Sequence, residues 1–230
     1  MRIEKADCMD LMSTMGGGSI DLIVTDPPYK LESLSGGGIA KQRDYFDDLK
    51  KLSDGIGSEQ LDEFMRVLKR PNLYLWGNWK LIQIYLDYFK DKDVNTNLLC
   101  WHKTNPTPLC GNKWLNDTEY CLYVRGKGVK LYGGYEDHKT YWCTNTNETA
   151  QTKTGHPTVK PLEIIMQMIK NSSMKNDVVF DPYLGSGTTA VAAKILNRDF
   201  IGCEINEKYI PLIEKRLNEC KSSISLDNWV

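Results

Sequence analysis

A polar tetrapeptide, Asp26-Pro27-Pro28-Tyr29, directly follows the apolar run 20–25. The run predicts a buried strand. The two prolines cannot donate hydrogen bonds to a neighbouring strand, so they hold the chain in an extended turn. Such a turn can point a carboxylate, an amide carbonyl and an aromatic ring into the crevice where parallel α/β sheets bind ligands. The same residues also fit a strand that ends in a structural proline turn, so the tetrapeptide alone leaves both interpretations open.

A second stretch, residues 178–189, combines a short strand, the acidic Asp181 and the turn Gly185-Ser186-Gly187. Two glycines let the backbone pass close beneath a ligand, and the helix that follows begins with unpaired amides. The next predicted strand, 199–204, ends in Glu204, an acid that could bind a ribose. A G-x-G turn alone is a weak signal. With a strand before it and an acid at the end of the following strand, it indicates a nucleoside-binding βαβ unit.

Together the two stretches resemble the S-adenosylmethionine-dependent amino-methyltransferases of DNA. Residues 26–29 match the catalytic motif of that family. Residues 180–188 match its cofactor motif, with Tyr183 in place of the usual Phe. The catalytic motif comes first in the chain, an order similar to that of the β-class. Glutamine methyltransferases share a similar Pro-Pro-Tyr but carry the glycine motif first, so the order separates the chain from them.

The resemblance implies roles for particular residues. The catalytic residues would be Asp26, Pro27, Pro28 and Tyr29. Residues 156–161 are similar to the family's H-P-T-x-K-P motif, which lies against the methionine end of the cofactor and offers Lys160 to its carboxylate. We expect His156 to make a structural hydrogen bond rather than to act as a general base. The cofactor-binding residues would be Asp7, Cys8, Asp26, His156, Thr158, Lys160, Asp181, Tyr183, Gly185, Ser186, Gly187, Thr188, Glu204 and Ile205. Asp7 also suits a helix N-cap, a compatible role.

The chemistry of an exocyclic amine explains why these residue types are needed. Its lone pair is delocalised into the base, so the site must favour a more tetrahedral nitrogen in line with the sulfonium methyl. Asp26 can accept one amino hydrogen, the Pro27 carbonyl the other, and Tyr29 can stack on a base flipped out of the duplex. The cofactor already activates the methyl group, so no metal or covalent nucleophile is required. Ring-carbon methylation uses a Pro-Cys nucleophile, and none of the seven cysteines follows a proline.

Three functions remain open from the sequence. We expect methylation of adenine N6 in DNA, as in a restriction-modification system. Methylation of cytosine N4 uses the same machinery, but that branch more often has Ser where this chain has Asp26. A non-catalytic DNA- or partner-binding protein on a degenerate scaffold is the third. The intact Asp26, Tyr29, Asp181 and paired glycines argue against it.

Composition sets further bounds. At 230 residues and 41% hydrophobic content, the chain fits a single α/β domain, 1–230. No apolar run approaches the ~20 residues that span a bilayer, and the amino terminus lacks a signal-peptide pattern, which predicts a cytoplasmic protein that meets DNA there. The cysteines include no C-x-x-C pair, which argues against zinc and for free thiols. The net charge of −1 neither supports nor excludes DNA, since only a local basic face is required.

The order of elements predicts the fold. Helices and strands alternate over residues 58–101, which indicates parallel crossover units. Residues 118–124 alternate polar and apolar and could form an antiparallel edge strand, and 206–219 an amphipathic helix that closes the sheet. The resemblance implies a Rossmann-like fold with permuted motif order. Its sheet would be mostly parallel and seven-stranded, with one antiparallel strand and helices on both faces.

The stretch 103–154 is polar, aromatic and slightly basic, which suits either a solvated surface or a DNA-binding one. In the resembling family this interval holds the target-recognition segment, here a small insertion. The glycine-rich 31–57 could be a lid beside the catalytic turn, although a plain flexible insertion is an alternative. We expect both to overhang the carboxyl ends of the strands, opposite the 206–219 helix, and a homodimer is possible. Candidate contacts to double-stranded DNA are Lys103, Lys113, Arg125, Lys127 and Lys130.

Overall fold

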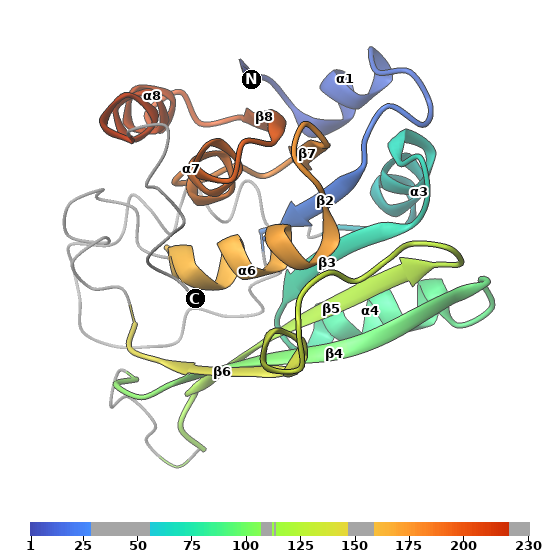
Figure 1. The fold of residues 1–230 in the computed structure, drawn as a ribbon, viewed down its shortest axis with the longest axis vertical. Helices are drawn as coiled ribbons and strands as arrows, with labels where there is room; N and C mark the ends of the chain where they lie inside the picture. Colours follow the sequence, from blue (N-terminus) through green and yellow to red (C-terminus); the bar gives the residue numbers. More distant parts are fainter. Residues whose placement is uncertain (29–55, 107–111, 113, 147–158, 221–230) are drawn as a thin grey trace.

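The described strands of the computed structural model form one eight-stranded sheet, in the order β1-β8-β7-β2-β3-β5-β4-β6 (Figure 1). The structure describes residues 1–28, 56–106, 112, 114–146 and 159–220. The strands are β1 (Arg2–Lys5), β2 (Leu22–Thr25), β3 (Asn72–Gly77), β4 (Val94–Lys103), β5 (Thr118–Gly126), β6 (Tyr141–Thr144), β7 (Val178–Asp181) and β8 (Asp199–Glu204).

Strand β5 is antiparallel to both of its neighbours, β3 and β4, and every other pairing in the sheet is parallel. The predicted Rossmann-like class and the single antiparallel strand are therefore confirmed. Two details of the predicted sheet were wrong. The sheet has eight strands rather than seven, and β5 is internal rather than at the edge. The reason is that β4 pairs with the whole length of β5, and the short β6 then adds beyond β4.

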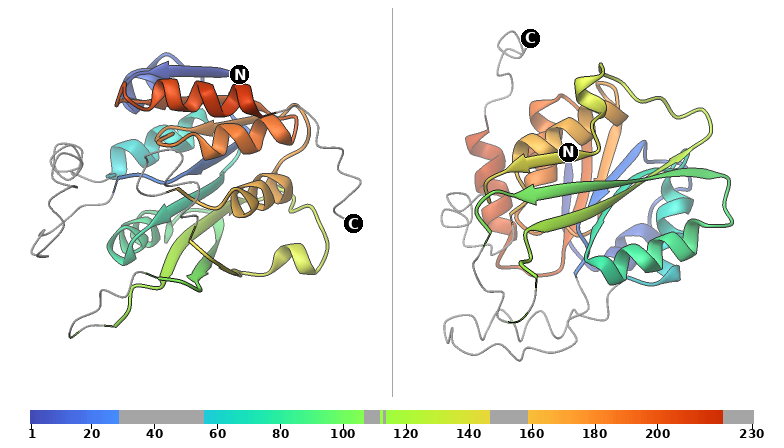
Figure 2. Two further views of the ribbon diagram at one scale, coloured as in Figure 1. Left: turned by 90° about the vertical axis from the view of Figure 1, so that its left-hand side faces the viewer. Right: turned by 90° about the horizontal axis from the view of Figure 1, so that it is seen from below.

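Helices cover both faces of the sheet (Figures 1 and 2). Three of them, α1 (Cys8–Ser13), α3 (Ser58–Val67) and α4 (Trp79–Phe89), bury their apolar sides in one core. On the other face α6 (Leu162–Ser172), α7 (Thr188–Ile195) and α8 (Ile210–Glu219) share a second core. A 3₁₀ turn, η2 (Glu136–His138), lies against α6. The N-cap of α3 is Gly57, whose backbone N–H donates to Gln60 Oε1 at 2.9 Å.

The sheet has two edges with different contents. The carboxyl edge, where the parallel strands end, holds Lys5, Thr25, Gly77, Lys103, Asp181 and Glu204. Because β5 runs the other way, it begins at the carboxyl edge and ends at the opposite one, which we call the amino edge. The register fixes this, since Tyr120 lies opposite Gly77 and Arg125 opposite Asn72. No helix in the described part of the chain is long and apolar enough to cross a membrane.

Candidate active site

Asp26 follows β2 at the centre of the carboxyl edge, with buried Pro27 next to it. The Lys160 ammonium donates a hydrogen bond to Asp26 Oδ2. Lys160 stands just before α6 and only 9% of its side chain is exposed. Burial on its own would lower the pKa of Lys160, but Asp26 and Glu119 outweigh it and the pKa is raised. A permanently charged lysine therefore holds the predicted catalytic carboxylate.

Glu119, near the start of β5, is the second carboxylate on Lys160. Its Oε2 lies 3.1 Å from Lys160 Nζ, and its Oε1 lies 2.6 Å from Lys103 Nζ. Burial raises the pKa of Glu119, yet the two lysines overcome that effect and the net pKa is lowered. Glu119 was not among the residues predicted from the sequence. The two-residue alternation of β5 could have found it, because that alternation places Glu119 on the same face as the buried Cys121 and Tyr123.

Asp181 joins β7 to β2 at this edge. Its Oδ1 accepts a hydrogen bond from Thr25 Oγ1 at 2.7 Å and one from the Tyr183 backbone N–H at 3.1 Å. The side chain is almost fully buried, and burial raises the pKa of Asp181 to about 6 against these hydrogen bonds, which lower it. The carboxylate thus fixes the start of the glycine turn relative to the catalytic strand.

The glycine turn follows at once and requires glycine for conformational reasons. Gly185 and Gly187 have φ of 51° and 80°, in the left-handed region that side chains rarely adopt. The Gly185 N–H donates to Glu204 Oε2 at 2.8 Å, so the turn is tied to the end of β8. A Cβ on Gly187 would lie 3.0 Å from the side chain of Ile213 on α8.

Arg216 of α8 also supports this turn. Its guanidinium donates to the Ser186 carbonyl oxygen and, at 3.2 Å, to Thr188 Oγ1. Burial lowers the pKa of Arg216. Helix α8 was predicted only to close the sheet, opposite the surface that faces DNA. The structure instead places one of its basic residues in direct contact with the predicted cofactor turn.

The predicted adenine side of the site gathers at the ends of β1 and β8. Asp7 caps α1 as expected, accepting the Met9 N–H at 2.8 Å. Cys8 Sγ donates to Tyr183 Oη at 3.2 Å, which connects α1 to the glycine turn. Ile205, directly after Glu204, leaves 46% of its surface exposed. The predicted cofactor residues that the structure describes therefore share one edge, contributed by segments far apart in the sequence.

Several predicted residues lie outside the part of the chain that the structure describes. They are Tyr29, Lys113, His156 and Thr158, with residues 31–55 of the expected lid. Six cysteines lie in the described residues, and none of these six forms a disulfide. Among those residues no cluster of three or more His, Cys, Asp or Glu side chains could hold a metal ion.

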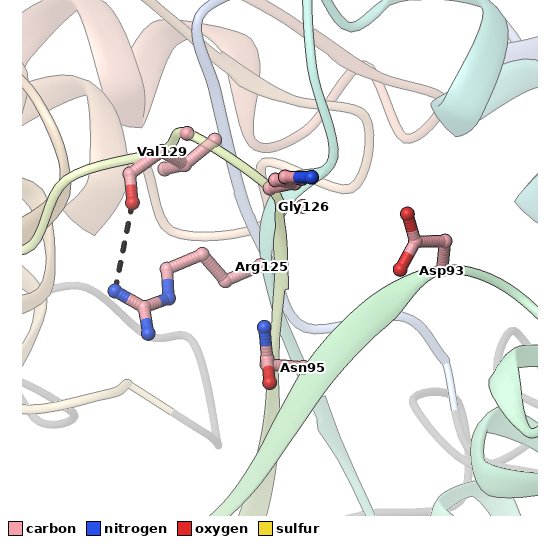
Figure 3. A pocket seen from close by; sticks show the side chains of 7 residues that line it. Asp93, Asn95, Arg125, Gly126 and Val129 are labelled. Atoms are coloured by element: carbon pink, nitrogen blue, oxygen red, sulfur yellow. Dashed lines mark hydrogen bonds between the residues drawn. The ribbon is translucent and has the colours of Figure 1, made fainter.

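The expectation that 103–154 overhangs the carboxyl edge was wrong for three of its five candidate DNA contacts. Lys103 lies at that edge, where its ammonium binds Glu119. Arg125 lies at the amino edge, and Lys127 and Lys130 follow the end of β5 there. The reversed direction of β5 is the cause. A pocket of about 480 Å³ lies at the amino edge. Figure 3 shows Asp93, Asn95 and Arg125 among the residues that line it.

The predicted insertion is also divided by the sheet. Strands β5 and β6 lie within it and belong to the sheet itself. The described residues directly after β4 and β6, 104–106 and 145–146, lie at the carboxyl edge, where the Thr104 N–H donates to the Thr144 carbonyl oxygen at 3.0 Å. The β5–β6 connection starts at the amino edge. Only part of 103–154 can therefore face a substrate that enters beside Asp26.

Comparisons with known proteins agree with this geometry. A family model described as DNA methylase, covering the N6 and N4 methylases, matches residues 20–215. The chain is 32% identical to the Type II methyltransferase M.HinfI of Haemophilus influenzae, over 95% of this chain and 68% of that protein. It is 33% identical to the Type II methyltransferase M2.DpnII of Streptococcus pneumoniae, over 94% and 89%. The crystal structure of an M1.HpyAVI complex with S-adenosylmethionine superposes with a TM-score of 0.71 at 25% identity, covering 94% of this chain and 98% of that one.

The matched span includes the Asp26 turn, Lys160 and the glycine turn, and the catalytic motif precedes the cofactor motif. The chain therefore belongs to the N6/N4 DNA methylase family, as a β-class DNA methyltransferase that takes its methyl group from S-adenosylmethionine.

Proposed function

We propose that the chain transfers the methyl group of S-adenosylmethionine to the exocyclic N6 of adenine in double-stranded DNA. The observation that carries the proposal is the position of Asp26. Its carboxylate lies at the end of β2, held by Lys160, and the Thr25–Asp181 hydrogen bond links the same strand to the glycine turn. A proton acceptor and a cofactor turn are thus built on neighbouring strands.

The roles in transfer follow from this arrangement. Asp26 accepts one hydrogen of the amine and the Pro27 carbonyl the other, which localises the nitrogen lone pair toward the sulfonium methyl. When bound, S-adenosylmethionine would supply the methyl group and leave as S-adenosylhomocysteine, and the proton that the methylated nitrogen loses would pass through Asp26 to solvent. Acceptance by Asp26 matters most as the nitrogen rehybridises, so it lowers the barrier more than it strengthens binding. Pro28 holds the turn, and Tyr29 stacks on the base.

The cofactor fits the described edge by chemistry. Glu204 can accept the ribose hydroxyls, because each carboxylate oxygen has lone pairs beyond the one that a backbone N–H uses. The exposed Ile205 and the start of α1, with Asp7 and Cys8, form an apolar and acidic surface for adenine. The glycine turn, Gly185 to Thr188, runs beneath. Lys160 has three N–H donors, and a third remains for the methionine carboxylate beside the two protein carboxylates.

DNA approaches the carboxyl edge in this proposal, because a flipped base must reach Asp26. Lys103 anchors the start of the β4–β5 connection, which presents Trp114, 98% exposed, to solvent. After β6, the Thr146 N–H donates to Asn105 Oδ1 at 2.6 Å, so two chain segments meet there. We propose these residues as the small target-recognition surface of a single catalytic domain.

The relatives named above are Type II methyltransferases. We propose that this chain likewise modifies a short DNA site as part of a restriction-modification system, in the compartment that holds the DNA.

Exposed apolar residues on α4 and β4, among them Ile84 and Leu98, support association of two copies. Sedimentation velocity tests this association, and a monomer at all concentrations contradicts it.

Product analysis tests the proposed reaction. Unmethylated genomic DNA of mixed sequence is incubated with the protein and methyl-deuterated S-adenosylmethionine, digested to nucleosides and examined by mass spectrometry. We expect label in N6-methyladenine. Label in N4-methylcytosine instead would replace adenine with the cytosine alternative. Absence of label in any base, with cofactor binding intact by calorimetry, would support the non-catalytic scaffold.

A further inference from the structure

Four charged side chains of alternating sign form a continuous row that begins at Asp26. Lys160 bridges Asp26 and Glu119, and Lys103 binds the second oxygen of Glu119. No catalytic or cofactor motif of the chain contains Glu119 or Lys103. The row leads from the reaction centre along the carboxyl edge to the end of β4.

The members of the row are fixed by rigid elements. Glu119 and Lys103 lie on paired strands, since Glu119 is opposite Trp101 in the β4–β5 register. The Lys103 ammonium lies 5.4 Å from the centre of the Trp101 ring, and Lys160 lies 5.1 Å from that of Trp76. Aromatic faces stabilise such cations beyond their ion pairs. Each ammonium is thus confined between carboxylate oxygens and an indole.

Burial makes the second carboxylate necessary. A lysine that is 9% exposed must recover the hydration it loses, and hydrogen bonds to carboxylates are the strongest source. With Asp26 as its sole partner, the Lys160 ammonium would pair with that carboxylate alone. Glu119, 23% exposed and itself neutralised by Lys103, shares the ammonium and fixes where it sits.

We propose that Glu119 is a positioning residue for methyl transfer, which acts through Lys160 to hold the Asp26 carboxylate in the orientation that receives the amine. Lys103 completes the row by holding Glu119. The inference rests on the proposed function, because it requires Asp26 to be the acceptor. Placement errors on the order of 1 Å at a reacting group cost about 100-fold in rate, so a residue that touches neither substrate can still control turnover.

The test compares Glu119→Gln, which removes the charge at nearly constant shape, with Glu119→Asp, which keeps the charge but shortens the side chain. Glu163→Gln on the exposed first turn of α6 is the matched control for loss of one acidic group. The single-turnover transfer rate at saturating DNA and S-adenosylmethionine is measured beside cofactor affinity by calorimetry. We expect Glu119→Gln to lower the rate roughly 10- to 100-fold with cofactor affinity within about threefold, Glu119→Asp to lie between, and Glu163→Gln to match the wild type.

Two results would overturn the inference. One is a wild-type rate in Glu119→Gln. The other is an equal loss of rate and cofactor affinity that Glu119→Asp does not relieve, since that describes a structural residue. If Glu119→Gln does not fold, Glu119→Asp alone is used: we expect a lowered transfer rate with cofactor affinity within about threefold of wild type, and a wild-type rate would overturn the inference. Asp26→Ala is assayed in parallel: full activity in that variant would refute the proposed function itself, whatever the Glu119 variants do.

Discussion

The two edges of the sheet differ in how their charged side chains are paired and buried, and strand β5 runs from one edge to the other. At its first end, Glu119 belongs to a row of partly buried ion pairs that reaches Asp26. At its last end, Arg125 donates only a long, 3.5 Å hydrogen bond to the Val129 carbonyl oxygen, and Lys127 and Lys130 are exposed. The pocket at the amino edge is open to solvent, and its charged lining residues are Asp93, Arg125 and Lys127.

This difference shows that the direction of the strands, rather than the presence of a hollow or of basic residues, locates the chemistry. In parallel sheets the ligand crevice forms where strands end and helices begin. The carboxyl edge has such ends from β1, β2, β7 and β8, with α1 and α7 starting beside them. The amino edge has Arg125, Lys127 and Lys130, but the described glycine turn beside them, Gly126 to Gly128, leads from β5 into a connection and not into a helix N-terminus. The predictions below probe that contrast.

The largest effect is expected at Asp26. Asp26→Ala removes the acceptor for the amine, so we expect the transfer rate to fall by about 10²- to 10⁴-fold, the range of a positioned acid–base group. Affinity for S-adenosylmethionine should change little, because the glycine turn is untouched. Single-turnover kinetics and calorimetry measure the two quantities. A transfer rate equal to that of the wild type would show that Asp26 is not the acceptor and that the carboxyl edge is not the reaction centre.

Gly185→Val should abolish cofactor binding. The residue has φ of 51°, which valine strongly disfavours, and its N–H must stay on Glu204. We expect calorimetry to detect no binding at S-adenosylmethionine concentrations that saturate the wild type, while circular dichroism shows a folded protein. Gly128, with φ of 81° at the amino edge, is the matched control. Gly128→Val should cost stability but leave cofactor affinity unchanged.

Much of this edge was predictable from the sequence, because motifs place residues at strand ends. Strand β8 coincides with the predicted range 199–204, and helices and strands alternate from residue 58 onward as predicted. Asp181, Gly185 and Glu204 meet as expected, since strand-turn-helix order alone brings them together. These features are local: a few consecutive residues determine each of them.

What the sequence did not predict depends on pairing between distant segments. The position of β5 inside the sheet decides which end of 103–154 faces the site, and no local pattern in residues 118–124 encodes its neighbours. Glu119 and Arg216 were missed for the same reason. Their partners, Lys160 and the Ser186 carbonyl, become neighbours only after the sheet and α8 are assembled.

Arg216→Met sharpens the comparison by testing indirect support of the carboxyl edge. The change removes the two hydrogen bonds to the glycine turn but keeps much of the side-chain volume. We expect affinity for S-adenosylmethionine to fall about tenfold, as for the loss of a charge-assisted hydrogen bond. Lys215→Met, one residue away with its side chain 71% exposed, is the control and should bind normally. Equal affinities of the two variants for S-adenosylmethionine would show that α8 has a purely structural role.

Asp181→Asn tests whether the buried carboxylate carries the expected energetic cost. The folded pKa of about 6 exceeds the ordinary 3.8, so the folded state holds the proton more tightly than the unfolded chain. The stabilising contribution of this group is therefore full below about pH 4 and is lost as the pH rises through 6. We expect the unfolding free energy of Asp181→Asn, relative to wild type, to increase by up to about 3 kcal/mol between pH 4 and pH 7. Urea titrations at a series of pH values measure it, and a pH-independent difference contradicts the assignment.

The smallest effect is expected at the amino edge, and it decides which end of 103–154 meets DNA. Lys127→Gln combined with Lys130→Gln should leave DNA affinity within about twofold of wild type, because the antiparallel β5 carries both lysines away from Asp26. Trp114→Ala, in the connection at the carboxyl edge, should weaken binding by about tenfold, the scale of one lost stacking contact.

Fluorescence anisotropy at several salt concentrations distinguishes DNA binding at the two edges. Each phosphate contact contributes roughly one unit to the slope of log affinity against log salt, so an unchanged slope in the lysine variant places the DNA elsewhere. A slope reduced by about two, with normal binding in Trp114→Ala, would instead put the DNA surface at the amino edge and reverse the comparison.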